Sequence, residues 1–269
     1  MKFNTAPILR EYIACAPLPL AIERSIECRL YKGRAFERPI LDVGCGEGLF
    51  AKILFAEPVD TGIDPDAREL QYALELGAYS ELIQCAGDAI PKPPGYFRTI
   101  FSNSVVEHIP ELEPVLREVR RVLSEDGVFY FTAPSDMFER YSVLYQLCRR
   151  LGMKRLGDQY RAFFNRFWRH YHCYSLAQWT SMVERCGFRV LEAFTYNPAM
   201  VCLMNDALVP FSFPSFVAKR LTNRWFFFPT IRRAIAKLLA VILEGRLGGA
   251  ERSQNGGLVF FALARADEA

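Results

Sequence analysis

Short apolar runs alternate with helical patterns along the chain from residue 39 onward. The apolar runs predict strands at 40–43, 61–64, 81–85, 98–102 and 128–132. Between them, apolar residues recur every three or four positions and predict helices at 47–55, 68–76 and 111–123. This alternation predicts an α/β fold, a doubly wound and mostly parallel sheet with helices on both faces and ligands at the carboxyl ends of the strands.

Two segments interrupt the alternation, residues 134–173 and 197–255. Neither segment contains a self-sufficient alternating pattern, so both are interpreted as insertions that form a cap above a single sheet. The regular pattern resumes between and after them, with a helix at 176–186 and strands at 188–196 and 257–264.

The first 37 residues precede the alternating region. They predict a helix at about 8–30, and we interpret 1–37 as an N-terminal helical lid and 38–269 as one domain that carries the two insertions. The apolar stretch 12–22 could suggest a signal peptide, but an acidic residue flanks it at each end and two prolines interrupt it. We therefore expect no targeting segment and a cytoplasmic protein.

Glycines cluster where the first predicted strand ends. Residues 40–48 read Ile-Leu-Asp-Val-Gly-Cys-Gly-Glu-Gly, so Gly44, Gly46 and Gly48 follow an apolar strand and open the next helix. Glycine removes the Cβ atom from a turn that needs unusual backbone angles, and it lets a ligand approach the main chain. The N–H groups at the helix start point toward such a ligand. Asp42 completes an Asp-x-Gly-x-Gly-x-Gly spacing, which differs from the Gly-x-Gly-x-x-Gly turn of dinucleotide-binding proteins.

Two further carboxylates follow predicted strand ends. Asp64 closes the second strand, where a carboxylate can accept hydrogen bonds from both hydroxyls of a ribose. Asp64, Pro65 and Asp66 can also simply begin a helix through an N-cap, and the two roles are compatible. Asp88 follows the third strand and either accepts a hydrogen bond from the amino group of an adenine or is an ordinary turn residue. Together the acids predict an adenosine-containing ligand.

These strand ends resemble the class I S-adenosylmethionine-dependent methyltransferases, in particular the methyltransferase type 11-like group of small-molecule enzymes. A nicotinamide dinucleotide site would use the same glycines and a later acid. The Asp-x-Gly-x-Gly-x-Gly spacing and the segment Ser-Asn-Ser-Val-Val-Glu-His at 102–108 favour the methyltransferase. The resemblance covers about residues 38–135, with a weaker match at 172–190, and its motifs are Leu41 to Gly48, Gly62-Ile63-Asp64, Gly87-Asp88-Ala89 and Phe101 to Ile109.

The resemblance implies a Rossmann-like sheet of about seven mostly parallel strands whose last strand is antiparallel. It also implies S-adenosyl-L-methionine as the cofactor. By this resemblance the glycine turn would hold the methionyl part, Asp64 the ribose, Asp88 the adenine, and Asn103 the amino acid part of the cofactor or the substrate. The cofactor-binding residues implied in this way are Asp42, Gly44, Cys45, Gly46, Gly48, Asp64, Pro65, Asp88, Ala89 and Asn103.

The chain has three histidines, His108, His170 and His172, all in segments expected near the cofactor-facing rim. Methyl transfer gains much of its rate from holding the acceptor in line with the sulfonium carbon, and a base is needed only if the acceptor arrives protonated. An imidazole suits that role near neutral pH, so these are the predicted catalytic residues, with His108 and His170 preferred. Alternatively, His108 anchors its loop together with Glu107, and His172 caps or orients the helix near Ser175.

The first insertion mixes aromatic and basic side chains. Because both insertions follow strand ends on the ligand side, we expect them to form the acceptor pocket. Aromatic residues interleaved with arginines can bind nucleic acid, an anionic lipid surface or a phosphorylated acceptor, or they can form an amphipathic face with solvated arginines. The net charge of +3 is too small to attract nucleic acid to the protein as a whole. Nucleic acid is therefore not an expected partner.

The second insertion is unusually apolar, since Asp206 is the only charged residue between 193 and 218. A helical stripe with basic residues beside it follows, as in helices that lie on a membrane surface. The segment 197–247 is therefore a candidate for binding a hydrophobic acceptor and for peripheral membrane contact. A buried lid or a homodimer surface is the alternative. The stripe consists of Ile231, Ile235, Leu238, Leu239 and Ile242.

Cysteine usage and hydropathy set further bounds. None of the eight cysteines forms a Cys-x-x-Cys pair or a Cys/His cluster at zinc spacing, so we expect reduced thiols and no metal site. No charge-free run reaches the ~18 residues that a membrane-spanning helix needs.

The sequence thus predicts S-adenosylmethionine-dependent methyl transfer to a small hydrophobic or aromatic acceptor, with oxygen as the expected methyl acceptor. Carbon methylation of a quinone or of a prenylated or lipid acceptor at the membrane surface is the alternative within this class. A cofactor-binding partner subunit without catalysis is the alternative from another class.

Overall fold

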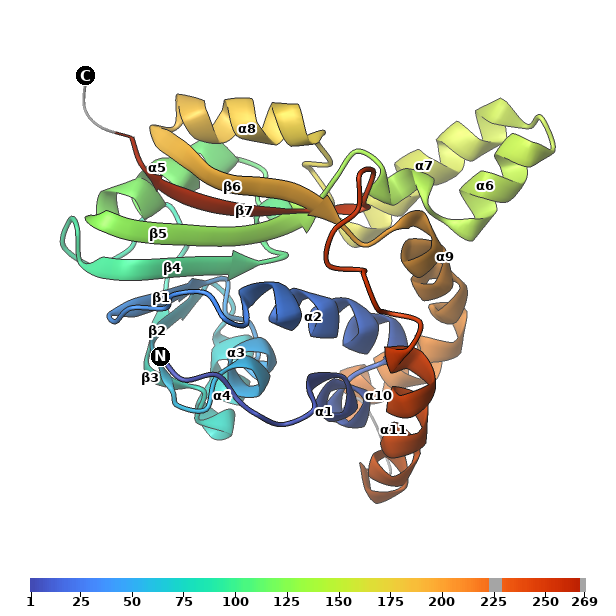
Figure 1. The fold of residues 1–269 in the computed structure, drawn as a ribbon, viewed down its shortest axis with the longest axis horizontal. Coiled ribbons are helices and arrows are strands. Elements are labelled where there is room, and N and C mark those ends of the chain that lie inside the picture. The colour runs from blue at the N-terminus through green and yellow to red at the C-terminus, as the bar shows by residue number, and fades with distance from the viewer. Residues whose placement is uncertain (223–228, 267–269) are drawn as a thin grey trace.

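The protein is built around one seven-stranded sheet (Figure 1). The computed structural model describes residues 1–222 and 229–266. The strand order is β3-β2-β1-β4-β5-β7-β6; β1 to β5 run parallel, and β7 is antiparallel to both of its neighbours. The predicted architecture and the predicted antiparallel last strand are thereby confirmed. The strands are β1 (Ile40–Val43), β2 (Val59–Asp64), β3 (Tyr79–Gln84), β4 (Phe97–Asn103), β5 (Leu123–Pro134), β6 (Phe188–Tyr196) and β7 (Leu258–Arg265).

Successive residues of the central strands face two separate cores. Ile40 and Tyr130 belong to one core, which packs against α1 to α4, whereas Leu41 and Phe129 belong to the other, which packs against α5 and α8. Side chains of a strand alternate between faces, so a continuous apolar run buries both faces of a sheet that helices cover on each side. The covering helices are α1 (Ile8–Cys15), α2 (Leu18–Tyr31), α3 (Leu49–Leu54), α4 (Ala67–Leu76), α5 (Leu112–Val122) and α8 (Leu176–Arg185).

The N-terminal segment forms two helices, and the prediction of a single helix at 8–30 was wrong. The chain leaves helical geometry at Ala16 (φ −131°, ψ 159°), and α2 begins after Pro17. Proline disfavours helical geometry in the residue before it and lacks the N–H that a continuous helix would use. The break redirects the chain, so that α2 crosses the sheet near the carboxyl ends of β4 and β5 (Figure 1).

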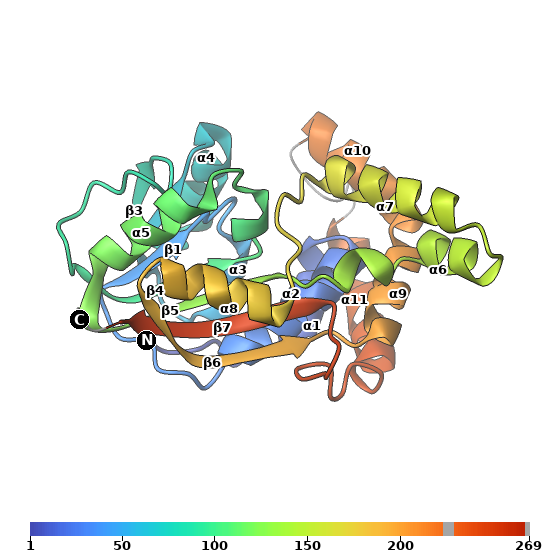
Figure 2. The same cartoon turned by 90° about the horizontal axis from the view of Figure 1, so that it is seen from above.

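The remaining helices gather beyond the carboxyl ends of β4 and β5 (Figure 2). Residues 223–228, inside the predicted membrane-contact segment 197–247, lie outside the described residues. Within the described ranges, no helix is both long enough and apolar enough to cross a bilayer. The helices of this group are η1 (Val106–His108), η2 (Phe138–Arg140), α6 (Val143–Arg150), α7 (Lys154–Trp168), α9 (Ala199–Leu208), η3 (Pro210–Ser212), α10 (Phe213–Thr222) and α11 (Pro229–Glu244).

Candidate active site

The glycine turn between β1 and α3 has a backbone that side chains rarely tolerate. Gly44, Gly46 and Gly48 have φ values of +77°, +51° and +77°. A Cβ atom on Gly44 would lie 2.4 Å from Cγ1 of Val105, so this glycine also allows the segment after β4 to pack against the turn. A Cβ atom on Gly46 would meet no heavy atom within 4 Å, so the turn faces open space there.

Asp64, at the end of β2, is bonded to the same turn. Its Oδ2 accepts a hydrogen bond from the N–H of Gly46 at 2.9 Å, and its Oδ1 accepts one from the N–H of Asp66 at 2.9 Å. Asp66 in turn caps α4 through the N–H of Arg68. The Asp64 carboxylate can accept further hydrogen bonds, as from the hydroxyls of a ribose. The open glycine turn beside it can donate backbone N–H groups to an adjoining charged chain. The residues present therefore fit a nucleoside-containing cofactor.

Asp42 and Cys45 lie under the turn. The Asp42 carboxyl is buried and accepts a 2.6 Å hydrogen bond from the Tyr79 hydroxyl. Burial raises the pKa of Asp42 to about 7, although the Tyr79 hydrogen bond acts in the opposite direction. The Cys45 side chain is buried and packs beside Gly62. Both side chains support the turn from the sheet side in this structure, and their part in cofactor binding stays a prediction.

The other residues expected at the cofactor differ in exposure. Pro65, Asp88 and Ala89 are exposed at the ends of β2 and β3. Asn103, at the end of β4, is half-buried and already engaged, since its Nδ2 donates to Glu27 at 2.8 Å and its Oδ1 accepts from Thr132 at 3.1 Å. The strand order places β3, β2, β1 and β4 next to one another, so these residues lie along one edge of the sheet.

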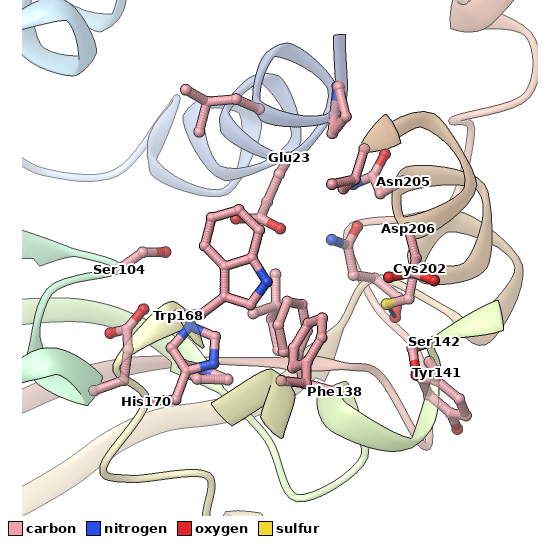
Figure 3. A pocket seen from close by; sticks show the side chains of 18 of the residues that line it. Glu23, Ser104, Phe138, Tyr141, Ser142, Trp168, His170, Cys202, Asn205 and Asp206 are labelled. Carbon is pink, nitrogen blue, oxygen red and sulfur yellow. Dashed lines mark hydrogen bonds between the residues drawn. The ribbon is translucent and has the colours of Figure 1, made fainter. Parts of the chain in front are cut away.

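A cavity of about 310 Å³ opens beyond the ends of β4 and β5. Figure 3 shows Glu23 pointing into it from α2, with Trp168 and His170 entering from the other side. The surface of its wall is mostly apolar, although about half of the lining residues are polar or charged and come from different elements. The apolar wall includes Leu20, Phe138, Phe164, Trp168, Val209 and Leu258.

The buried carboxylate Glu27 ties α2 to the sheet. Its side chain is fully buried and accepts four hydrogen bonds, from Arg24 at 2.5 Å, Asn103 at 2.8 Å, Ser104 at 2.9 Å and Tyr196 at 2.9 Å. A buried charge is tolerated when it is paired and fully hydrogen-bonded. The sequence analysis missed Glu27. The sequence offers no signal for it, because Asn103, Ser104 and Tyr196 lie 76, 77 and 169 residues away.

A second buried carboxylate, Glu107, lies against two of the predicted catalytic histidines. The rings of His108 and His170 are 5.2 Å apart, and His108 Nε2 is 3.8 Å from Glu107 Oε1. Burial raises the pKa of Glu107 to about 8 and lowers that of His170 to about 4, and it also lowers the pKa of His108. All three residues line the cavity. The structure thus joins His108 and His170, which are far apart in the sequence, with a glutamate that the sequence analysis considered only as a loop anchor.

His172 is placed differently from the other two histidines. One ring nitrogen is 3.0 Å from the Tyr174 hydroxyl, the other is 2.8 Å from the carbonyl oxygen of Ile109, and the residue is 9 % exposed. It is absent from the described residues that line the cavity. Both ring nitrogens hold the loop after η1 to the start of α8, which favours the alternative that His172 orients this helix, and its catalytic role stays a prediction.

Comparisons of the sequence point to one family. A family model described as a methyltransferase domain matches residues 21–193. The ubiquinone biosynthesis O-methyltransferase of Yersinia enterocolitica is 30% identical over 106 residues, which are 37% of this chain and 44% of that protein. The enzyme of the same name from Pectobacterium carotovorum is 30% identical over 103 residues, 36% of this chain and 43% of that protein. The chain therefore spans less than half the length of these curated relatives.

Solved structures share the fold at low sequence identity. A methyltransferase of Thermotoga maritima, described as a possible histamine N-methyltransferase, has a TM-score of 0.56 at 14% identity and covers 92% of this chain and 91% of its own. The phosphoethanolamine N-methyltransferase 2 of Haemonchus contortus, solved with phosphomonomethylethanolamine and S-adenosylhomocysteine, has a TM-score of 0.55 at 17% identity and covers 97% of this chain and 57% of its own. With the family model spanning most of the chain, the protein belongs to the methyltransferase-domain family and has the class I methyltransferase fold.

Proposed function

We propose that the protein methylates a hydroxyl oxygen of a small acceptor with an apolar or aromatic body, which binds in the cavity beyond β4 and β5. The observation that carries this proposal is the cavity itself, an apolar chamber with the polar Glu107, His108 and His170 cluster in its wall. A mostly apolar pocket with few polar groups is typical of small-molecule sites. The printed names of the partly matching relatives, which are O-methyltransferases, support oxygen as the acceptor atom.

The cofactor would lie over the glycine turn, next to this cavity. The turn and the start of α3 would hold the methionyl part, Asp64 with Pro65 the ribose, and Asp88 with Ala89 the adenine. Asn103 would face the amino acid part, and Asp42 would keep the turn in position from below. Val105 links the two sites, because it packs against Gly44 while the neighbouring Ser104 lines the cavity.

S-adenosylmethionine supplies a methyl group bound to a positively charged sulfur. The chain's own part is to orient the acceptor oxygen toward that carbon and to receive the hydroxyl proton. The His108 and His170 imidazoles are the proposed groups at the acceptor oxygen. Burial keeps both neutral near pH 7, so they can accept a proton, but an imidazole with a pKa of about 4 holds it weakly.

Product analysis with an acceptor panel tests this function. Phenols, catechols and hydroxylated quinol rings, each with and without an apolar tail, would be incubated with isotopically labelled S-adenosylmethionine, and the products would be identified by mass spectrometry and NMR. We expect methyl ethers, and His170→Ala should lower kcat by roughly 10²–10⁴-fold. The exposed Glu113→Gln serves as the control and should leave kcat unchanged.

Other outcomes of the same experiment overturn the proposal. Ring-carbon methylation would replace O-methylation with C-methylation of a quinone-like or prenylated acceptor. Cofactor binding in calorimetry without any methylated product would favour a non-catalytic partner subunit.

We further propose that the cap contacts a membrane surface from which a hydrophobic acceptor enters. Met200, Phe211 and Phe213 are 79%, 81% and 69% exposed, and on α11 the exposed Leu238 and Val241 lie close to basic residues. Exposed apolar side chains beside cations suit an anionic bilayer. In liposome flotation with phosphatidylglycerol vesicles, Phe211→Ser combined with Phe213→Ser should abolish co-flotation. Leu74→Ser, which changes an equally exposed leucine on α4, should leave it intact. No flotation of the unmodified protein would refute membrane contact.

A further inference from the structure

Three groups that commonly bind metal ions converge at the wall of the cavity. Glu107 and His108 come from η1, after β4, and His170 comes from the loop that follows α7. One candidate ligand atom from each residue lies within 4.8 Å of the others. Two imidazoles and a carboxylate form a ligand set that divalent first-row transition metals favour.

Two of these ligand groups have buried atoms without a hydrogen-bond partner. Oε2 of Glu107 and Nδ1 of His170 are both buried, and neither has a partner anywhere in the described ranges. Buried polar atoms are almost always paired, because leaving one unpaired costs its full desolvation penalty. In the tautomer of His170 that carries no proton on Nδ1, a cation between the two side chains would pair both atoms.

The third group, His108, is oriented as a metal ligand would be. Its Nδ1 is 3.2 Å from the carbonyl oxygen of Arg169, which requires that nitrogen to carry the proton and to donate it. The Nε2 lone pair is then directed to the side of Glu107, 3.8 Å from Oε1. Metal-binding histidines nearly always donate their other N–H to a carbonyl or a carboxylate in this way.

Distances and charges are compatible with an ion at this position. Ligand atoms about 2.1 Å from one metal ion lie roughly 3 to 4 Å apart, so small side-chain rotations would close the cluster around an ion. The nearest cation on the facing helix α2 is Arg24, and Glu27 pairs with it at 2.5 Å, with Glu23 at 3.5 Å. His108 is exposed, which leaves an entry path for the ion.

We propose that Glu107, His108 and His170 bind one divalent transition-metal ion, such as Zn²⁺, with its open positions toward the cavity. Building on the proposed function, the acceptor's hydroxyl oxygen occupies one open position. The ion lowers the pKa of that hydroxyl, as it does for bound water. Because His108 and His170 then bind the ion, the proton leaves to solvent and not to these imidazoles. The oxygen lone pair then forms the bond to the methyl carbon, while the electron pair of the broken carbon–sulfur bond stays on sulfur and neutralises its charge.

This proposal replaces the sequence expectation of no metal site. Zinc ligands are recognised in a sequence by short regular spacings. Here two ligands are adjacent and the third lies in an insertion, so only the fold brings them together.

Cobalt titration of the chelator-treated, full-length protein tests the site without acceptor or cofactor. Co²⁺ bound by these ligands absorbs visible light, and we expect one Co²⁺ per chain, displaced by Zn²⁺. Glu107→Gln, His108→Ala and His170→Ala should each weaken Co²⁺ binding by more than about a hundredfold, since even outer-shell changes cost 10–100-fold. Glu23→Gln, a carboxylate of the same cavity outside the cluster, is the matched control and should bind Co²⁺ as the unmodified protein does. His172→Gln is a second control.

The outcomes separate this proposal from the proposed function. A folded protein, verified by circular dichroism, that gives no Co²⁺ absorption refutes the metal site. So does Co²⁺ binding that survives all three ligand substitutions. Methyl transfer that continues at full rate in excess chelator refutes the ion's part in the reaction but leaves O-methylation standing. A bound ion in a protein that methylates nothing leaves the site standing and refutes the function.

Discussion

The glycine turn and the acceptor cavity differ in how their polar groups are held. At the turn, Asp64 bonds to Gly46 and Asp66, which are 18 and 2 residues away in the sequence. At the cavity, Glu27 bonds to Ser104 and Tyr196, which are 77 and 169 residues away. The hydrogen bonds of Asp64 are therefore local in the sequence, whereas those of Glu27 form only when α2, β4 and β6 have all assembled.

Because of this difference, substitutions in the two regions should have different effects. A change at the turn alters a local backbone shape, so it should mainly alter cofactor affinity. A change in the network around the cavity leaves buried groups of several elements without partners, so it should mainly alter stability.

Glu27→Ala should have the largest effect, a loss of unfolding free energy through the hydrogen-bond network beside the cavity. It removes the acceptor of four hydrogen bonds and leaves the Arg24 guanidinium buried without its main partner. Breaking a buried ion pair in this way costs about 3–5 kcal/mol of unfolding free energy. Urea denaturation followed by circular dichroism measures it.

The control for Glu27 is Glu113→Ala, which removes the exposed pairs that Glu113 forms with Arg117 and Arg185. Exposed pairs contribute about 0–1 kcal/mol, so this variant should unfold at nearly the urea concentration of the unmodified protein. Equal losses from the two substitutions would contradict the central place given to Glu27.

Gly44→Ala should distort the glycine turn and thereby lower the affinity for the cofactor. Its Cβ would lie 2.4 Å from Val105 Cγ1, and φ of +77° already disfavours any side chain. We expect S-adenosylmethionine binding, measured by calorimetry, to weaken about a hundredfold, which corresponds to about 2.7 kcal/mol of backbone strain and displacement. Gly77→Ala is the matched control, because Gly77 also has a positive φ (+58°) but ends α4 with open space around it. It should cost about 1 kcal/mol of stability and leave affinity unchanged. Similar affinity losses in both variants would mean that strain at Gly44 acts through global stability.

The same contrast explains what could be predicted from the sequence. The strands and the turn follow from local apolar runs and glycine spacing, and the predicted strand at 188–196 has the bounds of β6. The break of the first helix at Pro17 could have been predicted, because proline acts locally. Glu27 and Glu107 could not be identified as buried, because their surroundings come from elements that only the tertiary fold brings together. The insertions therefore predicted a pocket in outline, without its polar residues, and its role as the acceptor site stays a prediction.

Asp64→Asn tests whether Asp64 itself contacts the cofactor. The substitution keeps the shape of the side chain but removes the charge that strengthens hydrogen bonds from hydroxyl donors. S-adenosylmethionine affinity should fall about tenfold, the lower end of what a hydrogen bond to a charged group contributes. Asp66→Ala, which removes only the N-cap of α4, should cost about 1 kcal/mol of stability without changing affinity. If Asp66→Ala weakens binding as much as Asp64→Asn does, Asp64 acts through the helix cap and does not contact the cofactor.

Tyr79→Phe should have the smallest effect at pH 5.5, and that effect should grow as the pH rises. The Tyr79 hydroxyl donates to Asp42, whose pKa burial raises to about 7 from an ordinary value of 3.8. Between those values the folded state binds more protons at Asp42 than the unfolded state, so this group's contribution to stability falls as pH rises from about 4 to 7. The hydroxyl partly offsets that loss by stabilising the carboxylate. Its removal should therefore cost more at pH 8.5, up to about 2 kcal/mol, than at pH 5.5, where a hydrogen bond to a neutral carboxyl contributes about 1 kcal/mol.

Tyr130→Phe provides the control for this pH dependence, because the Tyr130 hydroxyl donates to the carbonyl oxygen of Ala35, which does not titrate. Its cost in unfolding free energy, measured in urea, should be equal at pH 5.5 and pH 8.5. A cost for Tyr79→Phe that is also independent of pH would mean that Asp42 does not change its protonation state over this range. Asp42 would then support the turn only as a hydrogen-bond partner of fixed charge. The stability of the turn would then not depend on pH between 5.5 and 8.5, as expected of a turn that is built from glycine backbone.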